Sequence, residues 1–109
     1  MTDIFELLKG KPEDSDYEKK GVIVQGITGS YGSIHAKQMI SYGTNVVAGV
    51  TPGKGGQKFE ETVPIYNSMQ EAVDATSAKI SIIFVPAKFF LSAAKDALNS
   101  GIKLLVAIP

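Results

Sequence analysis

Three regularly spaced glycines form the part of this sequence best suited to hold a phosphate group. They follow the apolar run at residues 22–24 and precede a segment with helical periodicity. Glycines in this context permit a tight turn and a close approach of phosphate to backbone N–H groups, and the helix N-terminus adds partial positive charge. On its own, the pattern also fits a turn whose glycines serve geometry alone. The candidate binding turn comprises Gly26, Thr28, Gly29, Ser30, Tyr31 and Gly32.

A second glycine-rich segment carries a lysine where a dinucleotide site carries an acid. In an NAD-binding domain, Asp or Glu after the second strand binds the adenine ribose. Here residues 51–56 read Thr-Pro-Gly-Lys-Gly-Gly, with Thr51, Pro52 and Lys54 as candidate binding residues. The lysine favours an anion such as the 3′-phosphate of coenzyme A or the 2′-phosphate of NADP. A mobile surface loop is the alternative, whereas a P-loop is excluded because Gly55 follows the lysine.

The remaining polar residues suggest neither a catalytic nor a metal site. His35 is the only histidine, and we expect it to serve packing or hydrogen bonding near the start of its helix. With no cysteine, a catalytic thiol or thiolate metal site is excluded. No Ser-His-Asp or paired-carboxylate arrangement can be assembled. Pro86 is placed to flank an adenine or pantetheine group, although proline is also common in the first turn of a helix.

Apolar and amphipathic segments alternate along the chain and predict the elements that position these motifs. Parallel strands covered on both faces are predicted at residues 22–24, 46–50, 80–85 and 104–108, with a shorter strand near an edge at 63–66. Helices are predicted at residues 33–42, 69–76 and 87–99. The first ends before Gly43, and Ser68 with Glu71 forms a capping box for the second. The third is expected to turn Phe89, Phe90, Ala93, Ala94, Ala97 and Leu98 toward the core.

This alternation predicts an α/β fold, a single Rossmann-like, doubly wound domain with a five-stranded parallel sheet in the order 3-2-1-4-5. In such sheets, ligands bind beyond the carboxyl ends of the strands, where the winding direction reverses. Residues 26–32 follow the first strand, residues 51–56 the second and residues 86–90 the fourth. All three segments are therefore expected at one edge of the sheet.

Length and composition restrict the organisation of the chain and its partners. The 109 residues suit one domain, predicted at residues 21–109 after an N-terminal helix and charged linker at residues 1–20. The chain has dispersed lysines, no arginine and a net charge of zero, so we expect no nucleic-acid partner. It also lacks a signal-peptide pattern and a bilayer-spanning stretch. We expect no membrane association and a cytoplasmic location, or the mitochondrial matrix in a eukaryote.

Together, the two glycine-rich motifs resemble those of the CoA-binding domain at the N-terminus of the succinyl-CoA synthetase (succinate–CoA ligase) α subunit. The resemblance covers about residues 20–108. It rests on residues 24–32, His35, Gln38 and residues 42–44, 50–56, 85–87 and 97–104. It implies coenzyme A as the ligand, contacted by residues 28–31 and Lys54, with the Val85-Pro86 pair lining the adenine side.

The resemblance also shows two departures from the family pattern. Ile108, which we include in the binding set, ends a strand that in the family continues into a Thr-Glu pair that helps to bind CoA. Pro109 follows here instead. The phosphohistidine domain of the family is also missing from these residues, and His35 matches a histidine of the CoA-binding domain itself.

The resemblance implies a ligase β subunit and a separate phosphohistidine domain as partners. In the complete family enzyme, the phosphohistidine relays phosphate from a nucleoside triphosphate to a carboxylic acid, and CoA captures the acyl phosphate. We do not expect this chain alone to catalyse that ligation. The alternatives are a free-standing CoA or acyl-CoA sensor and, less favoured, an NADP-binding domain.

Overall fold

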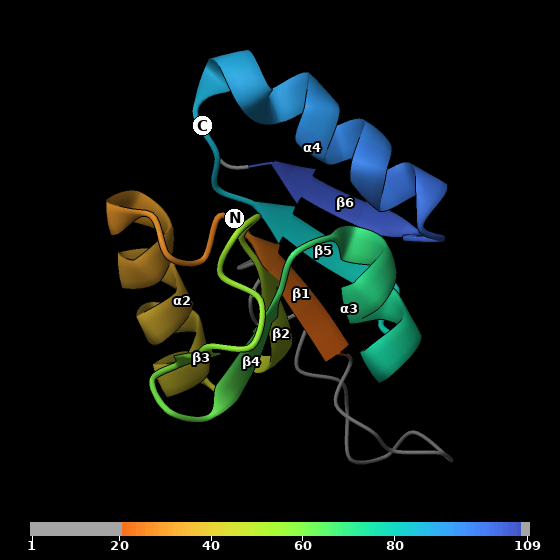
Figure 1. The fold of residues 1–109 in the computed structure, drawn as a ribbon. Helices are drawn as coiled ribbons and strands as arrows, with labels where there is room; N and C mark the ends of the chain where they lie inside the picture. Colours follow the sequence, from red (N-terminus) through yellow and green to blue (C-terminus); the bar gives the residue numbers. More distant parts are fainter. Residues whose placement is uncertain (1–20, 108–109) are drawn as a thin grey trace.

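The computed structural model describes residues 21–107, which form a six-stranded sheet and three helices (Figure 1). The strands are β1 (Gly21–Gln25), β2 (Asn45–Val50), β3 (Lys58–Phe59), β4 (Val63–Tyr66), β5 (Ile80–Ile83) and β6 (Leu104–Ala107). The helices are α2 (Ser30–Tyr42), α3 (Met69–Thr76) and α4 (Ala87–Asn99). The N-terminal helix and linker predicted at residues 1–20 lie outside the described residues. No helix within residues 21–107 is long and apolar enough to cross a membrane.

The sheet confirms the predicted fold class and corrects the number of strands. Its order is β3-β4-β2-β1-β5-β6, and all neighbours from β4 to β6 are parallel, in the predicted order. The sixth strand, β3, pairs antiparallel with β4 through Lys58 with Pro64 and Phe59 with Val63. A prediction of five strands misses β3 because two residues are too few to show a periodic pattern.

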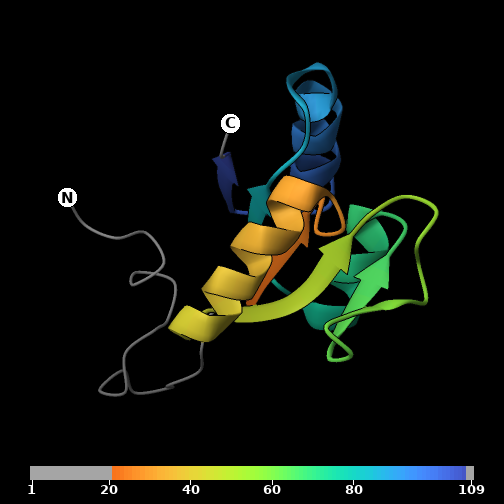
Figure 2. The same ribbon diagram turned by 90° about the vertical axis from the view of Figure 1, so that its left-hand side faces the viewer.

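Helices cover both faces of the sheet, as a doubly wound fold requires (Figure 2). On one face, Ala36 and Met39 of α2 pack against Val22 and Val24 of β1 and neighbouring residues of β5. On the other face, α3 and α4 contribute to a second cluster around Ile23 of β1. All four residues of β5 are buried. The continuous apolar runs of β1 and β5 are therefore explained by burial on both faces.

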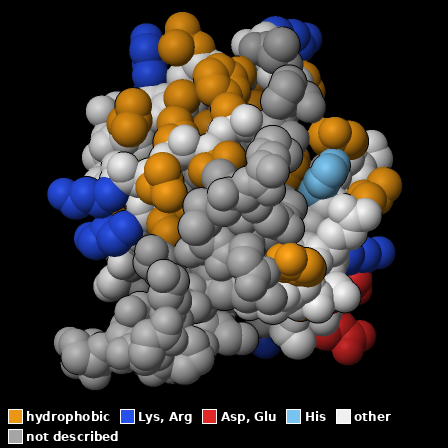
Figure 3. Space-filling view, turned by 180° about the vertical axis from the view of Figure 1, so that it is seen from behind, with side chains coloured by type: hydrophobic (Ala, Val, Ile, Leu, Met, Phe, Trp, Pro, Cys, Tyr) orange, Lys and Arg blue, Asp and Glu red, His pale blue; other side chains and the backbone are white. Residues whose placement is uncertain are grey.

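The burial of side chains in α4 and β6 differs from the prediction. Among the described strands, β6 lies at the edge, and Leu104 is 46% exposed. Helix α4 turns Ala94 and Ala97 toward the core, whereas Phe89, Phe90 and Leu98 are exposed. Only a narrow alanine strip of α4 faces the sheet, so the larger apolar residues fall on its other sides. Figure 3 shows hydrophobic side chains gathered in the upper part of the view, where α4 and β6 lie.

Ser68, the predicted capping residue, caps the start of helix α3 at Met69. The Oγ of Ser68 accepts a hydrogen bond from the Glu71 amide at 3.3 Å. The Glu71 carboxylate accepts a hydrogen bond from the amide of Asn67 at 3.4 Å. In a standard capping box the donor would be the amide of the next residue, Ser68.

Ser68→Ala is expected to lower the free energy of unfolding by about 1 kcal/mol, measured by urea denaturation. The matched control Ser41→Ala, at an exposed position in α2, is expected to change it by less than about 0.5 kcal/mol. Equal losses in the two variants would contradict this role of the cap.

Candidate functional site

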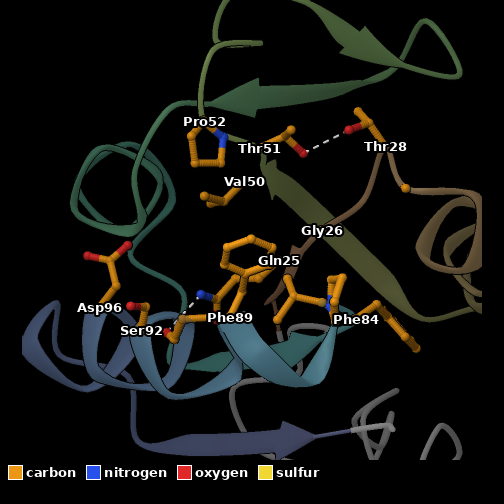
Figure 4. A pocket seen from close by; sticks show the side chains of 14 residues that line it. Gln25, Gly26, Thr28, Val50, Thr51, Pro52, Phe84, Phe89, Ser92 and Asp96 are labelled. Atoms are coloured by element: carbon orange, nitrogen blue, oxygen red, sulfur yellow. Dashed lines mark hydrogen bonds between the residues drawn. The ribbon is translucent and has the colours of Figure 1, made fainter.

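A cavity of about 570 Å³ opens beyond the carboxyl ends of β1, β2 and β5 (Figure 4). Strand β1 lies between β2 and β5, so the chain leaves β1 toward one side of the sheet and returns on the other. This is the reversal point at which doubly wound sheets bind ligands. The cavity is lined by Gln25, Gly26, Thr28, Gly29, Val50, Thr51, Pro52, Phe84, Val85, Pro86, Phe89, Ser92, Ala93 and Asp96.

The turn after β1 depends on two glycines that allow backbone segments to meet. Gly26 has a φ of +82°, and its amide donates to the carbonyl of Val50 at 3.0 Å. A Cβ on Gly26 would lie 2.4 Å from the carbonyl oxygen of Phe84. A Cβ on Gly32 would lie 2.1 Å from the carbonyl oxygen of Gly26. The glycines therefore let the first turn of α2 pack directly on the end of β1.

Helix α2 begins at Ser30, three residues before the predicted start. The prediction assigned all three glycines to a turn, whereas Gly32 lies in the first helical turn. The amide of Ser33 donates to the carbonyl of Gly29 at 2.7 Å and makes the first bond of the helix. The amides that precede Ser33 have no acceptor within the helix, and no acidic residue lies in its first turn. This end of α2 can therefore attract an anion through its backbone dipoles.

A hydroxyl pair joins the two glycine-rich motifs. Thr28 Oγ1 donates to Thr51 Oγ1 at 3.0 Å, and Figure 4 shows the two side chains pointing toward one another at the end of β2. The two threonines are 23 residues apart in sequence. The convergence of the motifs at one edge of the sheet follows the prediction.

The loop after β2 is held by several hydrogen bonds. Within it, the amide of Lys54 donates to the carbonyl of Thr51 and the amide of Gln57 to that of Lys54, which makes two successive turns. The amides of Gly53 and Gly55 both donate to Oδ1 of Asn67, each at 2.9 Å. Lys54 is exposed on this loop. These hydrogen bonds define the conformation of the loop.

The structure brings most of the predicted binding residues together at the cavity. Those that line it are Gly26, Thr28, Gly29, Thr51, Pro52, Val85 and Pro86. Ser30, Tyr31 and Gly32 lie in the first turn of α2, and Lys54 lies two residues after Pro52, but none of these four lines the cavity. Ile108 lies outside the described residues. The role of each residue in ligand binding stays a prediction.

His35 packs in an aromatic cluster beside the glycine turn. Its ring stacks on that of Phe84, with centroids 5.1 Å apart and planes 14° from parallel. The ring of Tyr31 meets it edge-on at 4.4 Å. These contacts confirm the expected packing role of His35. Within residues 21–107, no group of three or more His, Cys, Asp or Glu side chains could hold a metal ion.

Gln25 is a residue of the cavity that the sequence analysis did not select. Its side chain is 4% exposed and connects three elements. Nε2 donates to the carbonyl of Ala93 in α4 at 2.9 Å, and Oε1 accepts from Ser81 Oγ of β5 at 2.7 Å. Two signals in the sequence point to it: it is a polar residue at the end of an apolar strand, and it lies within residues 24–32, which carry the family resemblance. Gln25 thus fixes α4, which forms one wall of the cavity, against the sheet.

Helix α4 adds Ser92 and Asp96, which the sequence did not indicate, to Phe89 of the predicted segment 86–90. Figure 4 shows Phe89, Ser92 and Asp96 along the α4 side of the cavity, facing Val50 and Pro52. Asp96 Oδ2 accepts a hydrogen bond from the amide of Met69, the first residue of α3, at 3.2 Å. Asp96 therefore joins α4 to the start of α3. No motif in the sequence marks this long-range contact.

Comparison with solved structures identifies proteins with the same fold. A Rex-family repressor, RSP, superposes with a TM-score of 0.68 at 19% identity, covering 83% of this chain and 45% of that protein. A conserved hypothetical protein from Pyrococcus furiosus superposes with a TM-score of 0.66 at 27% identity, covering 83% of this chain and 75% of that protein. The Rex-family likeness shows the Rossmann-like fold alone.

Sequence comparison gives more specific relatives. The chain is 58% identical over 87 residues to the α subunit of an ADP-forming succinate–CoA ligase from Aquifex aeolicus, covering 80% of this chain and 28% of that protein. It is 53% identical over 91 residues to the α subunit of a malate–CoA ligase from Methylorubrum extorquens, covering 84% of this chain and 30% of that protein. The chain thus spans less than a third of the length of these relatives.

A family model described as the CoA binding domain matches residues 17–109. Together with the ligase relatives, this match favours the predicted resemblance over the NADP-binding and sensor alternatives. The chain therefore belongs to the CoA-binding domain family and is homologous to the N-terminal region of the succinate–CoA ligase α subunit.

Proposed function

We propose that this chain binds coenzyme A in the cavity at the carboxyl edge of the sheet. The observation that carries the proposal is that the two glycine-rich motifs meet at this one cavity, in a chain that belongs to the CoA-binding domain family. In the proposed complex, the pyrophosphate lies at the start of α2, where backbone amides and the helix dipole favour an anion. The 3′-phosphate lies near Lys54, and the adenine lies beside Val85 and Pro86.

The cavity lining supports a ligand that is anionic at one end and apolar elsewhere. The turn at Gly26 and Gly29 presents backbone to the cavity, whereas Val50, Phe84 and Phe89 present apolar side chains. Ligand sites of this kind combine an apolar lining with a few polar groups that set orientation. Coenzyme A has both parts, because its phosphates are charged and its adenine and pantetheine offer apolar surface.

We propose that the chain works as the CoA-holding part of an acid–CoA ligase. The relatives are named as α subunits of succinate–CoA and malate–CoA ligases. The partners in the proposal are a ligase β subunit and a phosphohistidine domain, which together supply phosphate transfer and acyl activation. Residues 21–109 form the CoA-binding domain in this proposal, and the cytoplasmic or matrix location stays a prediction.

Lys54→Ala tests the proposed site of the 3′-phosphate. The variant is expected to weaken coenzyme A binding about tenfold, the effect of removing one charged contact, in isothermal titration calorimetry. It is expected to leave the affinity for dephospho-CoA unchanged, because that ligand lacks the 3′-phosphate. Lys79→Ala is the matched control, since Lys79 is also exposed but precedes β5 at the opposite edge of the sheet.

Three titrations of the unmodified chain separate the alternatives. Coenzyme A is expected to bind more tightly than dephospho-CoA, and NADP is expected to bind weakly or not at all. Equal affinities for coenzyme A and dephospho-CoA would show that Lys54 does not recognise the 3′-phosphate. Binding of NADP alone would overturn the proposed function.

A further inference from the structure

We propose that Asn67 is a positioning residue that sets the place of Lys54 for the 3′-phosphate of coenzyme A. The inference rests on the proposed function, because it assumes that Lys54 meets this phosphate. Asn67 directly follows β4 and lies outside both glycine-rich motifs. Its side chain nevertheless organises the loop that carries Lys54.

One side-chain oxygen holds the backbone on both sides of Lys54. Oδ1 of Asn67 accepts from the amide of Gly53 at 2.9 Å and from the amide of Gly55 at 2.9 Å. The amide of Lys54 itself donates to the carbonyl of Thr51 at 3.0 Å. Three consecutive amides of the loop are therefore directed to acceptors within the protein. The backbone on both sides of Lys54, from residue 53 to residue 55, is thus held in place.

The close approach of Asn67 requires a glycine at position 55. A Cβ on Gly55 would lie 2.6 Å from Nδ2 of Asn67 and 2.7 Å from its Cγ. The glycine therefore leaves the space that the Asn67 amide group occupies. This gives one glycine of the second motif a specific role in accommodating the side chain of Asn67.

Asn67 is itself fixed between two elements of regular structure. The preceding residue, Tyr66, ends β4, and its carbonyl accepts from the amide of Thr51 at 3.1 Å. The following residue, Ser68, caps α3, and the amide of Asn67 donates to the Glu71 carboxylate. The loop is thus tied through Asn67 to the junction of β4 and α3.

The chemistry of asparagine suits a site for an anion. Both amides that flank Lys54 are used by Asn67, so the lysine side chain supplies the attraction of this loop for a phosphate. Aspartate has the same shape and could also accept both hydrogen bonds, but its charge would oppose that attraction. A neutral acceptor holds the loop without weakening the field of Lys54.

The test measures the preference for coenzyme A over dephospho-CoA by calorimetry on the 109-residue chain. We expect a preference of about tenfold in the unmodified protein. Asn67→Ala is expected to reduce it to less than about threefold, with the dephospho-CoA affinity unchanged. Asn67→Asp is expected to preserve the amide NMR signals of Gly53 and Gly55 while lowering the preference, more strongly at low salt. Asn99→Ala, an exposed asparagine at the end of α4, is the matched control.

Each outcome bears on the proposal separately from the proposed function. An unchanged preference in Asn67→Ala, or an equal loss of affinity for both ligands, would overturn the positioning role. If Asn67→Ala does not fold, an unchanged preference for coenzyme A in Asn67→Asp would overturn it as well. Absence of coenzyme A binding in the unmodified protein would instead reject the proposed function. In a double-mutant cycle, Asn67→Ala is expected to add no further loss to Lys54→Ala.

Discussion

Gly32→Ala is expected to lower the free energy of unfolding by about 3 kcal/mol and to abolish measurable coenzyme A binding. The new Cβ would lie 2.1 Å from the carbonyl oxygen of Gly26 and 3.2 Å from Cβ of Phe84. Neither neighbour is the end of a flexible side chain, so α2 must move away from the turn after β1. That movement displaces the amides proposed to hold the pyrophosphate. Urea denaturation and calorimetric titration measure the two effects.

Gly29→Ala is the matched control in the same motif. A Cβ on Gly29 would lie 3.5 Å from the carbonyl oxygen of Gly26, which is an ordinary van der Waals contact. Gly29 has φ −66° and ψ 154°, which an alanine adopts without strain. The free energy of unfolding is expected to fall by about 1 kcal/mol at most, because alanine is a poorer N-cap than glycine, and the loss stays well below that of Gly32→Ala. Similar losses of stability in the two variants would contradict the packing described for Gly32.

Gln25→Leu is expected to lower the free energy of unfolding by about 2 kcal/mol, measured by urea denaturation. The substitution keeps a side chain of similar size but removes both hydrogen bonds that Gln25 makes to Ser81 and Ala93. Ser81 is fully buried, so its hydroxyl is left without its partner. A buried polar group in that state destabilises the folded protein.

The Ser81→Ala variant provides the control for this effect. In the double variant Gln25→Leu/Ser81→Ala, no hydroxyl is left at position 81. Its loss of unfolding free energy is therefore expected to be about 1 kcal/mol smaller than the sum of the two single losses. Additive losses would show that the 2.7 Å contact between the two side chains contributes little.

The sequence predicted those parts of the fold that depend on local patterns. Continuous apolar runs identified β1, β2, β5 and their parallel arrangement, because buried parallel strands have no polar face. The Ser68 cap was visible because its partner lies three residues away. The spacing of the glycines located the turn after β1, although the start of α2 was placed three residues too late.

Contacts between distant residues account for what the sequence could not show. The side chain of Gln25 meets Ala93, 68 positions away, and Asp96 meets Met69, 27 positions away. No local pattern marks such pairs. The outward position of Phe89 and Leu98 was also hidden, because helical spacing identifies apolar positions but not which of them the sheet covers. Asn67 was missed for the same reason, since its partners are on another loop.

The most direct test of the central claim is an amide NMR titration of the chain with coenzyme A. We expect the largest shifts at Gly29, Ser30 and Tyr31 at the start of α2, with further shifts at Val85 after β5. Signals at the opposite edge of the sheet, such as Ser77 and Gly101, are expected to stay in place. Shifts confined to that opposite edge, or no shifts with saturating coenzyme A, would contradict binding at the cavity.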